Sequence, residues 1–270
     1  MPFSAWLAIL PEWISALLVI GFFVAFGNIT VLVVRRFVHH SILKPHNDVA
    51  GFVFATLGVI YGVMLAFVVV AILEQYNAAT QTAESESSNA YSLYRDLNLY
   101  PDHEETAQAL VALRAYSLSI VHDEYPNIKV MKWDEKYQPS LNTHKASIEL
   151  WKQVHQIAPQ NLHEQSIYDH ILKDINNMME YRVQRRLSAR TDLPKVVWGV
   201  VIAGGMIVIG FMALFGHENL RVHLLITTLL AIVTSSVIYV IICLNFPFVG
   251  CVSIAPDGYE YLIELAGWQR

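Results

Sequence analysis

One uncharged run constrains the fold of this chain more than any other feature. The stretch from Val49 to Leu73 contains no charged residue over 25 consecutive positions. A helix of this length crosses a hydrocarbon core of about 30 Å with some tilt. Because a bilayer offers no water to the backbone, such a run is typical of a membrane-spanning helix. The sequence therefore predicts an integral membrane protein.

Three further apolar runs have the same character, and charge is concentrated between the second and the third. The chain has a mean hydropathy of +0.40 and 15% charged residues, against about 25% in an ordinary soluble domain. The predicted fold class is an all-α integral membrane protein, with four transmembrane helices and a helical soluble domain inserted between the second and third. The predicted spans are 13–34, 49–73, 195–215 and 222–244.

The same patterns predict the domain boundaries. Residues 1–76 form a first transmembrane pair, 77–194 the soluble insert, 195–244 a second pair, and 245–270 a tail with a possible interfacial helix. Beyond the second span, apolar residues keep a three-to-four spacing, and no Gly or Pro intervenes before Pro101. We therefore expect that helix to continue to about Leu99, with Glu84 and Glu86 on its outer faces.

Small residues form a stripe along the second span. They recur at steps of four, three, four and four, at Gly51, Ala55, Gly58, Gly62 and Ala66. Such spacing places them on one face of a helix, and small residues let another backbone approach closely in a membrane. The stripe has two possible roles, which are packing inside one subunit or forming a subunit interface or pore.

A polar motif, His46-Asn47-Asp48, precedes the second span. Pro45 makes a continuous helix improbable there. Asn47 or Asp48 is then expected to cap the span by accepting a hydrogen bond from its first turn, and an acid at this end also suits the helix dipole. The alternative role is ion coordination at the mouth of a pore.

A cluster of cations ends the long helix predicted for residues 163–190. Its apolar face is predicted to include Ile171, Ile175, Val183 and Leu187, and its last turns contain Arg182, Arg185, Arg186 and Arg190. Cations at that end favour the helix dipole and can meet lipid phosphates. The alternative is a vestibule that collects anions.

The chain shows none of the common catalytic or ligand-binding motifs. There is no H-E-x-x-H pair, Walker loop, G-x-S-x-G or G-x-G-x-x-G. A net charge of −5 without a basic block argues against nucleic acid. We therefore expect no enzyme activity, no catalytic residues, no cofactor and no metal site.

Two segments carry a family resemblance that covers almost the whole chain. The stretch HNDVAGFVFATLGVIYGVMLAFVVVAILEQY resembles the signature of the bacterial bestrophin-like membrane proteins, a domain family of unknown function. The tail LNFPFVGCVSIAPD is similar to that family's closing motif, here Asn245, Pro247, Phe248 and Gly250. Asn245 stands where the family pattern has Asp. The family name implies distant kinship with bestrophins, which are oligomeric anion channels.

Two functions are compatible with these features. The leading hypothesis is a homo-oligomeric channel for small anions, gated by dewetting at a hydrophobic constriction of Phe52, Tyr61 or Phe67. The alternative is a non-conducting, membrane-anchored scaffold or sensor whose helical insert binds a partner protein. Both have the lipid bilayer as a partner, and the resemblance implies the bacterial cytoplasmic (inner) membrane.

The side of the insert rests on two opposing charge signals. Short connectors place Arg35, Arg36, Lys44 and Arg221 together, which favours those turns in the cytoplasm and the insert in the periplasm. The basic turns at 182–195 indicate the opposite orientation. Short loops weigh more in this rule, so we favour a periplasmic insert.

Overall fold

The described part of the chain consists of helices joined by turns and loops, and contains no strand. The computed structural model describes residues 7, 10–101, 104–131, 140–250 and 252–268. Its longer helices are α2 (Glu12–Phe37), α4 (Asn47–Leu99), α5 (Glu104–Ser119), α7 (Leu141–Val154), α8 (Leu162–Ser188), α9 (Lys195–Phe211), α10 (Leu220–Asn245) and α11 (Asp257–Leu265). The short ones are α3 (His40–Leu43), η1 (Lys44–His46), the π-turn η2 (Ile120–Glu124), α6 (Tyr125–Lys129) and η3 (Met212–Leu214).

Four helical stretches within these residues are long and apolar enough to cross a membrane. They are Glu12–Phe37, His40–Leu99, Lys195–Leu214 and Leu220–Asn245. Each contains one of the spans predicted from sequence, apart from a residue at an end, so an all-helical chain with four apolar spans is confirmed. Helix α4 also continues to Leu99, because no Pro lies between residues 46 and 100 and no Gly follows Gly62 before the helix ends.

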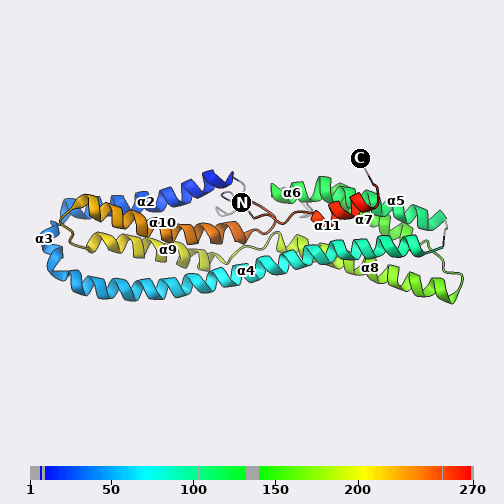
Figure 1. The fold of residues 1–270 in the computed structure, drawn as a ribbon, viewed down its shortest axis with the longest axis horizontal. Helices are drawn as coiled ribbons and strands as arrows, with labels where there is room; N and C mark the ends of the chain where they lie inside the picture. The colour runs from blue at the N-terminus through cyan, green and yellow to red at the C-terminus, as the bar shows by residue number, and fades with distance from the viewer. Residues whose placement is uncertain (1–6, 8–9, 102–103, 132–139, 251, 269–270) are drawn as a thin grey trace. The chain divides into compact units, whose positions relative to one another are not determined.

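The chain divides into two compact units. Unit 1 consists of residues 1–75 and 192–245, and unit 2 consists of 76–191 and 246–270. Helix α4 contributes its first half to unit 1 and its second half to unit 2 (Figure 1). The tail helix α11 belongs to unit 2, whose core contains its Tyr259 and Leu262.

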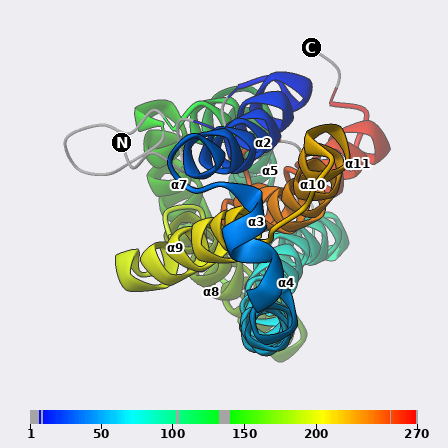
Figure 2. The same cartoon turned by 90° about the vertical axis from the view of Figure 1, so that its left-hand side faces the viewer.

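Unit 1 is held by close helix packing and by hydrogen bonds between spans. Asn28 of α2 donates to Thr228 of α10 over 2.9 Å, while Ser235 donates to the carbonyl of Ala231 in its own helix. Hydroxyls on α10 thus bond their own backbone or a neighbouring span, as such groups usually do in membranes. Seen from the connector end, α4 lies at the edge of this unit and is not enclosed by the other spans (Figure 2).

The connector between α2 and α4 differs from the sequence prediction. Instead of a break at Pro45, the turn η1 passes directly into α4, because this proline stands in the first turn of η1, where its missing N–H is not needed. The cap predicted for Asn47 is therefore wrong. Its side chain instead accepts from Gly216 N over 2.8 Å and donates to Gly216 O over 3.3 Å.

Unit 2 is built on a heptad-like seam. In α4 one set of buried positions follows alternating steps of four and three residues, namely Ala79, Ala83, Glu86, Ala90, Leu93, Leu97 and then Tyr100 just beyond the helix, and Ser87 and Asp96 are buried beside it. In α8 the equivalent positions are Ile171, Ile175, Met178, Arg182 and Arg185. Such spacing keeps one face of each helix toward its neighbours. Charged residues therefore occupy positions that the pattern assigns to the core.

Candidate functional site

The small-residue stripe of α4 is open within a single chain. A Cβ added at Gly51, Gly58 or Gly62 would meet no atom within 4 Å, and Ala55 and Ala66 are exposed. A neighbouring face of the same helix packs against the rest of unit 1, since Leu65 and Ile72 are buried there. The stripe is thus available for packing against something other than its own chain.

The three candidate gate residues do not share one environment. Phe52 and Phe67 are 77% and 73% exposed. Tyr61 is buried, donates to Val201 O over 2.8 Å and packs where a Cβ on Gly204 would come within 2.5 Å of its ring. Only Phe52 and Phe67 therefore remain free to form a constriction with another chain.

The predicted mouth motif lies at the connector end of unit 1. His46 and Asp48 are exposed, whereas Asn47 is bonded to Gly216. Gly216 has no room for a side chain, because a Cβ would collide with the backbone of Lys44. Asn47 thus fixes the 216–219 turn against the start of α4.

Asn245 ends α10 as a fully buried amide. Its Oδ1 accepts from Leu193 N over 3.1 Å, and its Nδ2 donates to Asp192 Oδ1 over 2.7 Å. The same carboxylate oxygen accepts from Trp198 Nε1 over 3.1 Å. Asn245 therefore joins the end of one span to the residues that start another, and the donor amide suits the neighbouring acid.

We predict that Asn245→Asp destabilises unit 1. The change replaces an N–H donor by a second carboxylate against Asp192, so one acid must take up a proton or lose its partner. The expected loss is about 1–3 kcal/mol, measured as a lower melting temperature of the full chain in detergent. Asn245→Leu is the matched comparison, and an unchanged melting temperature for Asn245→Asp would contradict the assigned contact.

The rest of the tail motif lies in unit 2. The carbonyl of Pro247 accepts from Ile254 N over 2.8 Å. Phe248 is 2% exposed and meets Tyr125 edge-on at 6.0 Å. Gly250 has φ of 81°, a left-handed value that glycine adopts without strain. This motif therefore folds the tail onto the core of unit 2.

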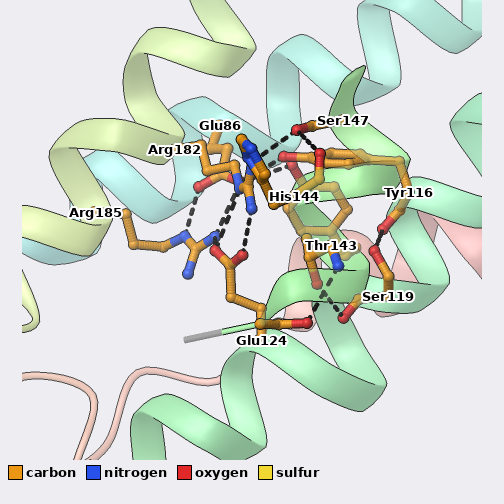
Figure 3. A network of polar contacts seen from close by, with 11 residues as sticks. Glu86, Tyr116, Ser119, Glu124, Thr143, His144, Ser147, Arg182 and Arg185 are labelled. Atoms are coloured by element: carbon orange, nitrogen blue, oxygen red, sulfur yellow. Dashed lines mark hydrogen bonds and ion pairs between the residues drawn. The ribbon is translucent and has the colours of Figure 1, made fainter. Parts of the chain in front are cut away.

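A fully buried network of charged side chains is the most unusual feature of unit 2. Arg185 pairs with Glu86 (Nε–Oε2, 2.5 Å) and with Glu124 (Nη2–Oε1, 2.7 Å). Glu124 also pairs with Arg182 (Oε2–Nη2, 2.6 Å), whose Nη1 donates to Ser147 over 3.1 Å. Figure 3 shows these side chains converging, with Glu86 from α4, Glu124 from η2, Ser147 from α7 and both arginines from α8. The two acids and two bases balance, which such burial requires.

Aromatic residues complete the shell of this network. The hydroxyls of Tyr116 and Tyr259 donate to Glu86 Oε1 over 3.3 and 2.9 Å. Burial raises the pKa of both tyrosines, and the charge of Glu86 raises it further, so they stay protonated donors. The guanidinium of Arg185 lies 4.7 Å from the ring centre of Tyr125, within cation–π range.

Electrostatics fixes the charge state of the network. Burial by itself would raise the pKa of Glu124, but the positive charges of Arg185 and Arg182 outweigh it and hold the pKa below its usual 4.5. Burial would likewise lower the pKa of Arg185, and Glu86 and Glu124 hold it well above normal. Glu124, Arg182 and Arg185 are therefore charged at neutral pH.

We predict that unit 2 loses stability in acid through Glu124. Because its folded pKa is depressed, its stabilising contribution is present above 4.5 and is lost as pH falls through the lowered value. Circular dichroism of the full chain in detergent should show loss of unit 2 helix in that window. Glu149→Gln, which changes an exposed acid of α7, should leave the acid midpoint unchanged, and full helicity down to about pH 2 would contradict the prediction.

The network overturns two sequence interpretations. Glu86 was expected on an outer face of α4, and Arg182 and Arg185 at a helix end exposed to lipid or ions, yet all three are buried. Val183 and Leu187, predicted for the apolar face of α8, are 52% and 61% exposed. The alternating steps of four and three that link these charged residues to apolar positions of the same helices were the signal that could have located them.

The described residues give no sign of a metal centre. None of their His, Cys, Asp and Glu side chains form a group of three or more that could hold an ion. In the charged centre of unit 2, Glu86 and Glu124 are paired with arginines, while Nη1 of Arg185 is buried without a hydrogen-bond partner among the described residues. These ion pairs join segments of unit 2 that lie far apart in sequence.

Comparison with known proteins identifies the fold and the family. The Bestrophin-like domain matches residues 21–259. A bacterial bestrophin homologue from Klebsiella pneumoniae, solved by zinc phasing, is 13% identical and superposes with a TM-score of 0.66 over 92% of this chain and 99% of its own. A second structure, described as a membrane protein, is 12% identical, with a TM-score of 0.71 over 92% and 98%. No curated protein matches. The length and placement of the domain match establish that this chain belongs to the Bestrophin-like family.

Proposed function

We propose that this chain is the subunit of a homo-oligomeric channel that conducts small anions across a bacterial cytoplasmic membrane. The observation that carries the proposal is the open stripe of α4, where Gly51, Gly58 and Gly62 contact nothing in their own chain. Small residues favour close helix packing in lipid, so copies of α4 would meet along the stripe. Family membership supports the same reading.

In this arrangement the uncharged half of α4 would border the conduction path. Phe52 and Phe67 are exposed in the single chain, and each directly follows a residue of the stripe in sequence, Gly51 and Ala66. Brought together from several copies, such rings would form an apolar constriction that gates by dewetting. Unit 2 would be the soluble insert with the tail packed onto it.

The insert is proposed to lie in the periplasm. The basic turns at 182–195 favoured a cytoplasmic insert, but two of their arginines count less in the structure. Arg182 and Arg185 form buried ion pairs and are not exposed to the membrane surface. Arg35, Arg36 and Arg221 in the short connectors then dominate. A cysteine introduced at exposed Lys173 should react with a membrane-impermeant maleimide in intact cells, above the background of the unmodified chain.

Reconstitution tests conduction directly. Purified protein in liposomes should release chloride when valinomycin carries potassium across the membrane to balance the charge. In the converse experiment, where a chloride ionophore replaces valinomycin, the liposomes should not release potassium. Protein-free liposomes provide the control. An intact oligomer that passes no chloride would reject the channel and favour the scaffold, whereas equal flux of both ions would reject anion selectivity.

A further inference from the structure

Unit 2 contains a cavity whose chemistry differs from that of an anion path. It has a volume of about 510 Å³ and lies between α4 and the segment 253–261. This volume falls in the range of small-molecule sites, about 300–1,000 Å³. The cavity is separate from the charged network, although Tyr125 and Tyr259 contribute to both.

The walls of this cavity are acidic and contain no base. Its lining includes the carboxylates of Glu84 and Asp257 and the hydroxyls of Ser87 and Ser88, but no Lys, Arg or His. An anion entering it would meet two negative charges without a compensating cation. A cationic ligand would instead be attracted from both sides.

Tyrosine rings supply the second half of the recognition chemistry. Tyr76, Tyr91 and Tyr261 line the cavity, and the last two are 39% and 60% exposed. Ring faces attract cations that come within about 6 Å of the centroid. Unit 2 already uses this interaction internally, where Arg182 lies 5.7 Å from the ring centre of Tyr116.

The floor of the cavity is fixed before any ligand arrives. Gly258 lies so close to Ser87 that a Cβ would collide with the serine side chain. Tyr259 is 1% exposed and anchored to Glu86 by its hydroxyl. A preformed site loses less entropy on binding than one that must be ordered by its ligand.

We propose that this cavity binds a small organic cation, an amine or a quaternary ammonium compound. Glu84 and Asp257 neutralise its charge, and the rings of Tyr76, Tyr91 and Tyr261 surround its apolar part. The start of α11 also lines the cavity and by itself would favour an anion. Asp257 stands in that first turn and supplies the opposing charge, so the site as a whole selects cations.

Calorimetric titration of the full chain in detergent tests the site. The probes are choline and 1,4-diaminobutane, with 3,3-dimethylbutan-1-ol as the uncharged isostere of choline and inorganic phosphate as the anion. At least one cation should bind with a dissociation constant below about 1 mM, and the isostere at least about tenfold more weakly. Failure of both cations, binding of the isostere equal to that of choline, or preferential binding of phosphate would each overturn the proposal.

Matched variants locate the binding. Glu84→Gln, a change on the exposed surface of α4, should weaken cation binding by about tenfold or more, and Tyr91→Leu by about two- to fivefold. Glu260→Gln changes an exposed acid of α11 outside the cavity and should leave binding unchanged. If Glu84→Gln and Glu260→Gln weaken cation binding equally, the cation is attracted only by the overall negative charge of the protein, and the proposed site is overturned. The assay is independent of ion flux, so it distinguishes this proposal from the channel.

Discussion

Arg185→Met is expected to lower the free energy of unfolding of unit 2 by about 3–5 kcal/mol, the usual cost of leaving a buried charge without its partner. The variant removes the only cation that pairs with Glu86 among the described residues, while Tyr116 and Tyr259 remain as neutral donors. Glu124 keeps Arg182. Urea unfolding of the full chain in detergent, followed by circular dichroism, measures the loss, because detergent maintains the apolar helices.

Lys173→Met provides the matched control for this variant. It removes a cation from the same helix at an exposed position, where substitutions usually change stability by no more than about 0.5 kcal/mol. Equal effects of Arg185→Met and Lys173→Met would contradict the buried network. A further comparison is Arg185→Lys, which keeps the charge but cannot bridge two carboxylates with the planar fork of arginine.

Replacing both Gly58 and Gly62 with leucine is expected to abolish assembly and at least about 90% of chloride flux. The side chains would fill the groove through which another helix approaches. Neither position has a neighbour in its own chain within 4 Å, so unit 1 should still fold. Size-exclusion chromatography with light scattering measures assembly, and the liposome assay measures flux.

Two other glycines separate assembly from folding. Gly21→Leu adds the same bulk at an open position of α2 that lies off the stripe, and should leave the oligomer intact. In Gly204→Leu the new side chain would collide with the ring of Tyr61. This variant should lower the stability of unit 1, since overpacking costs about 1–3 kcal/mol. Unchanged assembly of the Gly58 and Gly62 double variant would reject the interface on α4.

Elements with a strong local signal were predictable. The four apolar spans follow from run length, and the continuation of α4 to Leu99 follows from spacing without Gly or Pro. The break predicted at Pro45 is absent, because a proline in the first turn of a helix is compatible with helical structure. The cap predicted for Asn47 is absent, because its side chain bonds Gly216, which lies 169 positions away in sequence. Local capping rules do not include such a contact.

The sequence by itself determined the long helices, the four apolar spans, the concentration of charge in the long middle segment and the family. Only the tertiary structure decided which charges are buried, because a glutamate on a heptad position stays in the core only if a cation from another helix meets it. Glu86 and Arg185 are 99 positions apart, and their burial rests on that distant pairing. The side of α4 left open was decided in the same way, by which face packs on α9, where Tyr61 donates to Val201 O and lies against Gly204.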